Sequence, residues 1–167
     1  MFIIHRINMT IKRLTQQLYY KIIFGNKVLF GENFRSRGKF NLFVDKTGAI
    51  TFGKNVFLNN DFSANCQNRI EIGDNCIFGE NVKMYDHNHV FAKRNIPISK
   101  QGFNSATIKI GKDCWIGSNV TILKGVQIGD NCVIGANCLI YKNIPSNSVV
   151  KLKEQLIISE RNENKYL

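Results

Sequence analysis

Residues 110–140 read IGKDCWIGSNVTILKGVQIGDNCVIGANCLI, with an isoleucine at every sixth position. A six-residue period fits neither an α-helix nor a plain alternating strand. It fits a coil with three short flat sides, in which the apolar residue that opens each hexad points inward. The opening tetrad, an aliphatic residue or Phe followed by Gly, any residue and Asn or Asp, occurs eight times. The eight tetrads begin at Phe30, Phe52, Ile72, Phe78, Ile110, Ile116, Ile128 and Ile134.

Three hexads make one coil of about 18 residues, and stacked coils lie about 4.8 Å apart with hydrogen bonds between their parallel strands. Glycine and asparagine are expected to turn the corners, because both tolerate left-handed backbone angles. The repeat therefore predicts an all-β solenoid of about five coils over residues 25–150, within a single domain. Residues 1–24 are expected to form an N-terminal helix and residues 151–167 a C-terminal tail.

The cysteines follow the repeat. Cys76, Cys114, Cys132 and Cys138 each come four residues after a hexad-opening residue, a position that takes small inward side chains. None of the five cysteines has the spacing of a zinc site or a disulfide framework. We expect them to be buried thiols that pack like small apolar residues, which suits a reducing compartment.

The positive charge is unevenly distributed. The net charge is +11, and residues 1–40 hold eight Lys or Arg and one acid. Nucleic-acid binding is a weak interpretation because no recognition motif accompanies this charge. Residues 1–24 show an apolar stripe at helical spacing, flanked by basic residues. The stripe consists of Ile3, Ile7, Ile11, Leu14, Leu18 and Ile22.

Two interpretations of this helix stay open. The stripe packs across the open end of the solenoid or on a neighbouring subunit, which we favour. Alternatively, the helix lies on a membrane surface and is attracted to anionic lipid. No apolar run is long enough to span a bilayer, and residues 1–20 lack the features of a secretory signal.

The repeat breaks at MYDHNHVF, residues 84–91, which contains two of the three histidines. The segment VFAKRNIPISKQGFNSATIK, residues 90–109, then intervenes before the phase restarts at Ile110. A long excursion from a solenoid with short corners indicates a function, and Lys93, Arg94 and Lys100 suit an anionic ligand. His87 and His89 lie two residues apart, so on an extended segment they point to the same side.

The chain from about Asn59 to Pro145 resembles the hexapeptide-repeat O-acetyltransferases, especially the maltose and galactoside acetyltransferases and related polysaccharide O-acetyltransferases. The stretches IGDNCIFGENVKMYDHNHVF and IGKDCWIGSNVTILKGVQIGDNCVIGANCLIYKNIP carry this resemblance. It implies a left-handed parallel β-helix, a homotrimer, a cytoplasmic bacterial enzyme and acetyl-CoA as co-substrate, with no metal. The implied reaction moves an acetyl group to a sugar hydroxyl in surface polysaccharide biosynthesis.

The resemblance also implies site residues. Counting 17 residues from Ile72 makes His89 the catalytic base, and imidazole titrates near neutral pH as that role requires. Asn59 matches a substrate-binding asparagine, and Tyr85, Asp86 and His87 are further candidates for substrate contacts. The positions that match coenzyme contacts are Trp115, Ser118, Ala136, Tyr141 and Lys142.

Among these, the backbone N–H of Ser118 matches the donor to the oxyanion of the tetrahedral intermediate. One segment departs from the family. The sequence SVVKLKEQLIISERN after Asn147 lacks the usual glycine and proline near the nucleotide end of the coenzyme. Lys151 and Lys153 offer compensating charge at this end.

Three alternatives remain. One is N-acylation of a nucleotide-linked amino sugar on the same fold. Another is a metalloprotein resembling γ-carbonic anhydrases, which needs three imidazoles around zinc, whereas the third histidine, His5, falls in the N-terminal helix. The last is a purely structural solenoid, which leaves the long loop and the histidines unexplained. If the helix binds lipid, the enzyme is peripheral at the inner face of the membrane.

Overall fold

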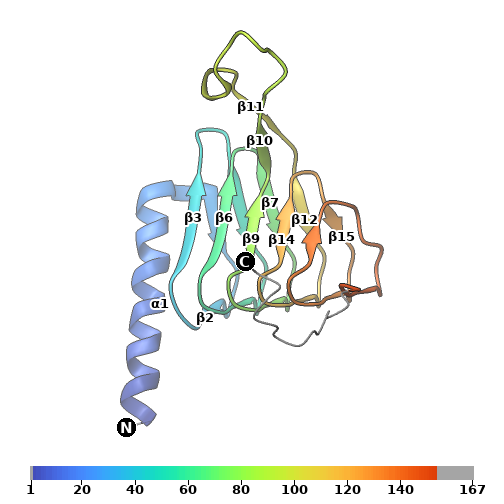
Figure 1. The fold of residues 1–167 in the computed structure, drawn as a ribbon. Coiled ribbons are helices and arrows are strands. Elements are labelled where there is room, and N and C mark those ends of the chain that lie inside the picture. The colour runs from blue at the N-terminus through green and yellow to red at the C-terminus, as the bar shows by residue number, and fades with distance from the viewer. Residues whose placement is uncertain (1, 154–167) are drawn as a thin grey trace, which may run out of the picture.

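The protein is a stack of triangular coils whose flat sides are three parallel β-sheets, with one helix across an end of the stack (Figure 1). This computed structural model describes residues 2–153, and within residues 2–12 only the backbone and the side chains of Thr10 and Ile11. Sheet A contains β1 (Val28–Phe30), β4 (Ala49–Phe52), β7 (Arg69–Ile72), β12 (Ile108–Ile110) and β15 (Gln127–Ile128). Sheet B contains β2 (Arg35–Ser36), β5 (Phe57–Leu58), β8 (Ile77–Phe78), β13 (Trp115–Ile116), β16 (Val133–Ile134) and β18 (Val149–Val150). Sheet C contains β3 (Phe40–Val44), β6 (Phe62–Cys66), β9 (Lys83–Tyr85), β14 (Thr121–Leu123) and β17 (Leu139–Ile140).

The hexad residues form the core, as predicted. Strands pair in register from coil to coil, so that Ile72 lies beside Ile110 and Ile110 beside Ile128. All five cysteines are buried free thiols, which confirms the interpretation as small core residues. The structure thus confirms the left-handed β-helix of about five coils. The hexad-opening residues from the second coil on are all buried, namely Phe52, Leu58, Ala64, Ile72, Phe78, Met84, Ile110, Ile116, Ile122, Ile128, Ile134 and Ile140.

The corners are turned by asparagine and aspartate. Asn55, Asn75 and Asn131 have φ values of 57°, 60° and 56°, in the left-handed region. The prediction that the hexad glycines share these angles is wrong, because they are not among the residues with positive φ. They are needed for close stacking instead, since a Cβ on Gly31 would lie 2.2 Å from the carbonyl oxygen of Gly53 in the next coil.

Helix α1 (Phe2–Phe24) lies across the open end of the first coil and leads through the short helix η1 (Gly25–Lys27) into β1 (Figure 1). Tyr20 attaches it: the Tyr20 hydroxyl donates to the Phe40 carbonyl at 2.9 Å and accepts from the Leu42 amide at 3.1 Å. These are backbone groups of the edge strand β3, which would otherwise lack a partner on this side.

The apolar stripe of α1 does not face the coils. Its described members Ile11, Leu14, Leu18 and Ile22 are all exposed, whereas Ile3 and Ile7 lie outside the described side chains. Packing of the stripe on the open end of the solenoid is therefore a wrong prediction. The polar side of the helix, with Gln16 and Tyr20, reaches the backbone of β3 instead. The stripe is therefore free to contact a molecule other than this chain.

We expect Tyr20→Phe to lower the free energy of unfolding by about 1–3 kcal/mol, because two buried backbone groups of β3 lose their partner. Burial raises the pKa of the Tyr20 phenol, so the hydroxyl keeps its proton near neutral pH. Tyr19→Phe is the matched control, because Tyr19 is 56% exposed whereas Tyr20 is 6% exposed. Urea unfolding at equal protein concentrations measures both variants, and equal destabilisation would contradict the anchoring role of Tyr20.

The excursion is a hairpin that projects beyond the coils (Figure 1). Its stem pairs β10 (His87–His89) with β11 (Phe103–Ser105), and the short helix η2 (Ile98–Lys100) lies in its loop. The side chain of Gln101 ties the loop by accepting from the Lys93 amide at 2.9 Å and donating to the Ile96 carbonyl at 2.7 Å. The excursion thus occupies residues 87–107, beginning with His87 and ending before β12, rather than 90–109.

Candidate active site

Both histidines lie in the stem of the projecting hairpin, against one aromatic ring. The ring of His87 meets Phe103 edge-on with centroids 5.2 Å apart, and the ring of His89 lies 4.4 Å from Phe103. Because both imidazoles contact the same ring, they share one face of the hairpin, as their spacing predicts. Phe103 was not singled out from the sequence, although it is the aromatic residue opposite His89 at the return of the excursion.

Asp86 is a buried carboxylate directly below this stem. It accepts hydrogen bonds from the backbone amides of Gln67 at 2.8 Å and Asn68 at 2.7 Å. Oδ2 of Asp86, which accepts from Asn68, also lies 3.3 Å from the thiol of Cys66. Burial and the nearby carboxylate together raise the pKa of Cys66 to about 12. The thiol therefore stays protonated and donates, so every neighbour of the carboxylate supplies a proton.

Asp86 also holds His87. Oδ1 of Asp86 lies 2.9 Å from Nδ1 of His87, whose side chain is only 16% exposed. A carboxylate only accepts hydrogen bonds, so this contact selects the tautomer of a neutral His87 ring in which Nδ1 donates and Nε2 is the acceptor. His89 is exposed and contacts no carboxylate in the described part of the chain. The geometry therefore favours His87 as the proton acceptor, whereas counting from Ile72 selects His89.

A second group of predicted residues surrounds a groove at the turns from sheet B to sheet C, which we call the B/C corner. Trp115, Ser118 and Ala136 line this groove of about 370 Å³, together with Val149 and Lys151. Its walls are mostly apolar, and the indole of Trp115 is exposed on the outer face of sheet B. An apolar groove with a lysine at its side fits a pantetheine arm that ends in phosphate groups.

The backbone amide of Ser118 is a free donor because of the side chain in the next coil. At the same corner one coil earlier, the amide of Glu80 donates to the hydroxyl of Ser118 at 3.1 Å, and at the turn after β12 the amide of Lys112 donates to Asp130 at 2.7 Å. The residue one coil after Ser118 is Ala136, whose methyl group accepts no hydrogen bond. Consequently, the Ser118 amide donates to nothing within residues 2–153.

The structure separates the predicted residues into two groups. Asn59 follows β5 and belongs to the B/C corner, where its side chain accepts from the Asn60 amide at 2.9 Å. The remaining predicted residues lie at the turns from sheet C to sheet A, which we call the C/A corner. These are Tyr85, Asp86, His87, His89, Tyr141 and Lys142.

The two corners are too far apart for one reaction. In a single coil, Lys124 follows Ser118 by six residues across sheet C, a span of about 20 Å, whereas proton transfer needs about 3 Å. Trp115, Ser118 and Ala136 therefore do not meet the histidines within one chain. Tyr141 and Lys142, predicted to bind the same coenzyme, lie at the C/A corner, with the Lys142 ammonium 5.4 Å from the Tyr141 ring centroid.

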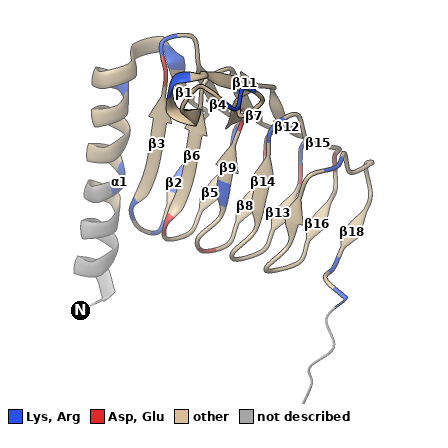
Figure 2. Cartoon of the chain, turned by 45° about the horizontal axis from the view of Figure 1, so that its top comes forward, with Lys and Arg blue, Asp and Glu red and all other residues tan. Residues whose placement is uncertain are grey.

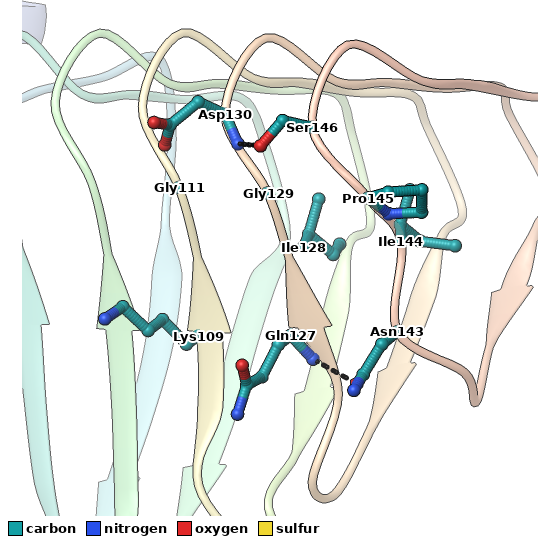
Figure 3. A pocket seen from close by; sticks show the side chains of 10 residues that line it. All are labelled: Lys109, Gly111, Gln127, Ile128, Gly129, Asp130, Asn143, Ile144, Pro145 and Ser146. Atoms are coloured by element: carbon teal, nitrogen blue, oxygen red, sulfur yellow. Dashed lines mark hydrogen bonds between the residues drawn. The ribbon is translucent and has the colours of Figure 1, made fainter.

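A further hollow, outside both corners, contains none of the predicted residues (Figure 3). It has a volume of about 520 Å³ and lies along sheet A at the end of the stack, where Asp130 and Ser146 face each other. Its polar groups pair within its own wall, since the Asp130 amide donates to the Ser146 hydroxyl at 3.0 Å and the Gln127 amide to Asn143 at 2.9 Å. We therefore place no chemistry there.

Neither a metal site nor a membrane span is found in the described part of the chain. No three His, Cys, Asp or Glu side chains within it converge as metal ligands, and the side chain of His5 lies outside it. Within residues 2–153, no helix combines the length and apolarity needed to cross a bilayer.

Comparison with known proteins agrees with the fold. The signature of the bacterial transferase hexapeptide (six repeats) matches residues 107–142. The chain is 33% identical over 140 residues to WbbJ of Escherichia coli (strain K12), named for lipopolysaccharide biosynthesis O-acetyl transfer, with 80% of this chain and 71% of WbbJ covered. This chain belongs to the bacterial hexapeptide-repeat transferase family.

Two solved structures of this family share the fold. A galactoside acetyltransferase in complex with coenzyme A has a TM-score of 0.63 and 29% identity, covering 84% of this chain and 76% of the other. A hexapeptide-repeat acetyltransferase of Vibrio cholerae O1 biovar eltor with acetyl-coenzyme A has a TM-score of 0.67 and 25% identity, covering 81% and 70%. The chain is accordingly an acyltransferase, as predicted.

Proposed function

We propose that this hexapeptide-repeat transferase moves an acetyl group from acetyl-CoA to a hydroxyl group of a sugar in surface polysaccharide biosynthesis. The observation that carries the proposal is the His87–Asp86 pair, in which Nδ1 lies 2.9 Å from the carboxylate and Nε2 has no such partner within residues 2–153, on a projecting hairpin. The groove with the free Ser118 amide supports the choice of donor. Similarity to a protein named for O-acetyl transfer in lipopolysaccharide biosynthesis supports the class of acceptor.

In the proposed mechanism, His87 takes the proton of the sugar hydroxyl at Nε2 as the hydroxyl oxygen forms a bond to the acyl carbon. Asp86 stabilises the imidazolium that forms, since it already accepts from Nδ1 at 2.9 Å. The amide of Ser118 donates to the oxygen that gains negative charge, a contribution of about 3 kcal/mol in comparable sites. His87 then returns its proton to the leaving sulfur as the carbon–sulfur bond breaks. Acetyl-CoA supplies an already activated acyl group when bound, so no enzyme nucleophile is needed.

We also propose that the enzyme is a homotrimer, because its two groups of site residues lie at different corners of one chain. Closed threefold symmetry brings the B/C corner of one subunit to the C/A corner of its neighbour. Each of three sites then has His87 from one chain and the groove of Trp115, Ser118 and Ala136 from the next. Asn59 joins the groove side, and Tyr141 and Lys142 join the histidine side.

Tyr85, Lys142, Lys151 and Lys153 keep their predicted roles in this proposal, whereas His89, predicted as the base, becomes a substrate contact. Tyr85 lies next to Asp86 at the end of β9 and offers a ring face to the sugar, and His89 offers a second polar contact beside Phe103. Lys142 and Lys151 are the proposed partners of the coenzyme phosphates, since Lys151 lines the groove and Lys142 lies at the facing corner. Lys153 is exposed near the end of the described chain.

We expect purified protein to release free thiol from acetyl-CoA when a hydroxylated sugar, nucleotide-sugar or glycan acceptor is present. A thiol-release assay across a panel of acceptors measures this, with each neutral sugar matched by its amino-sugar counterpart. Turnover confined to the amino sugars would replace O-acylation by N-acylation of the nucleotide-linked kind. Absence of turnover with every acceptor, together with absence of coenzyme binding, would contradict the proposed function.

A further inference from the structure

The outer face of helix α1 is an apolar surface directly opposite its attachment to the coils. Successive residues of an α-helix are about 100° apart, so Ile11, Leu18 and Ile22 point within about 20° of the direction opposite Tyr20. Each is more than half exposed, and Ile22 reaches 74%. We define the outer face of α1 as Ile11, Leu14, Leu18 and Ile22, which are all exposed.

The apolar and polar sides of α1 are reversed relative to a typical surface helix. A helix on the surface of a globular protein buries its apolar stripe and exposes its polar side. Here Gln16 and Tyr20 face the coils, where both reach the carbonyl of Phe40, and the aliphatic side chains face outward. A contiguous exposed apolar surface of this kind marks a contact with another molecule or a membrane.

The charge around the outer face is positive. Helix α1 contains four Lys or Arg and no acidic residue. At about 100° per residue, Lys12 and Lys21 fall at the two edges of the outer face, whereas Arg6 and Arg13 fall on the side of Tyr20. The first coil, residues 28–48, adds Arg35, Arg37, Lys39 and Lys46 and two acids, Asp45 and Glu32, of which Glu32 lies 3.5 Å from the ammonium of Lys54. Figure 2 shows no acidic residue on the described part of α1 at this end of the stack. A cationic helix with one apolar face has the composition of helices that lie on anionic bilayers.

The direction of the outer face argues against a neighbouring subunit as its partner. Helix α1 lies across the end of the stack, so its outer face points along the stack and away from the coils (Figure 2). The two corners with site residues lie on the sides of the stack, and a trimer that joins them places subunits side by side. In such a trimer, the three outer faces point the same way and are not covered by one another.

We propose that the outer face of α1 docks on an anionic bilayer and holds the stack of coils upright on the membrane. The aliphatic side chains enter the headgroup region, and the flanking Lys and Arg contact lipid phosphates. The histidine hairpin leaves the third coil, two coil spacings of about 4.8 Å beyond the first, so it lies within about 20 Å of the lipid surface. This height suits an acceptor sugar carried on a membrane lipid, a consequence that rests on the proposed sugar acylation.

Vesicle co-sedimentation tests the docking. We expect the wild-type protein to bind phosphatidylcholine vesicles that contain phosphatidylglycerol, to bind pure phosphatidylcholine weakly, and to be released by salt. Leu18→Asp and Ile22→Asp should each lower binding at least about 10-fold, because a charge replaces an inserted aliphatic group. Ile98→Asp is the matched control, since Ile98 is 55% exposed but lies in the excursion loop. Binding that is absent in the wild type, or equal in all variants, overturns the proposal.

A second measurement separates a membrane from another copy of the chain. Size-exclusion chromatography with light scattering, without vesicles, should give the same mass for the wild type and Leu18→Asp, with unchanged circular dichroism. A lower mass for Leu18→Asp would make the outer face a protein interface and overturn the proposal. Leu18→Asp should also retain acyl transfer to a water-soluble acceptor within about twofold, because Leu18 lies far from both corners. If the wild-type protein bound vesicles but transferred no acyl group, the proposed function would be contradicted and the docking proposal would stand.

Discussion

Replacing His87 with alanine is expected to lower kcat/KM for acyl transfer by about 10²- to 10⁴-fold, the range typical for loss of a general base. The imidazole that accepts the hydroxyl proton is removed, and Asp86 is left with no ring to orient. Replacing His89 should lower kcat/KM by less than about 10-fold, because His89 contacts Phe103 but no carboxylate in the described chain. Steady-state thiol release at saturating acetyl-CoA measures both variants.

His87→Ala and His89→Ala serve as controls for each other, because both replace an imidazole of the same hairpin stem with a methyl group. Added imidazole should restore part of the activity of His87→Ala, because it supplies the missing proton acceptor, and circular dichroism should match the wild type. The reverse ranking, with His89→Ala the inactive variant, would return the base to the position that counting from Ile72 predicts. Asp86 would then serve only to tie the corner to the amides of Gln67 and Asn68.

The sequence located both histidines and, through the family resemblance, selected His89 as the base, whereas the contacts in the structure favour His87; the reason for the difference is physical. Spacing along one hexad predicts which residues share a corner, and His87 and His89 share both corner and face. What distinguishes them is a carboxylate that is buried by backbone amides from the preceding coil, 18 and 19 residues earlier in the chain. No local sequence pattern indicates which amides will do this, because every residue type except proline has a backbone N–H.

The orientation of α1 was unpredictable for a related reason. A 3.6-residue period shows that Ile11, Leu14, Leu18 and Ile22 share a face, but it does not show which side of the helix meets the coils. Tyr20 decides this by satisfying two edge groups of β3, a non-local contact that leaves the stripe exposed. The hexads were predictable because each one repeats the same local rule, an inward apolar residue followed by a left-handed Asn or Asp.

The separation of the site into two corners could have been recognised from the repeat. Ser118 and Ala136 occupy the same position of successive coils, whereas Tyr141 and Lys142 follow the next hexad and so fall at the next corner. Assigning all four to one coenzyme already requires two chains. The structure adds the groove itself and the free Ser118 amide, which depend on side chains one coil away.

Two inactive variants should therefore restore activity when they are mixed in one trimer. His87→Ala removes the base at the C/A corner, and Ala136→Trp fills the groove at the B/C corner, where Ala136 is exposed and a larger side chain leaves the core intact. Each variant alone should retain less than about 1% of wild-type activity. In a cyclic trimer that contains both variants, one of the three sites takes its histidine from an Ala136→Trp chain and its groove from a His87→Ala chain. We therefore expect about one third of wild-type activity in such trimers.

The experiment co-expresses the two variants with different tags, purifies trimers that carry both tags and measures thiol release. Trimers with two differently tagged His87→Ala chains are the control and should stay inactive. If each chain contained a whole site, both defects would persist in every mixed trimer and no activity would return. Such a result would contradict the shared site and require one chain to bring Ser118 and His87 together across sheet C. Because the chain between these corners spans about 20 Å, this would need a rearrangement of the coils themselves.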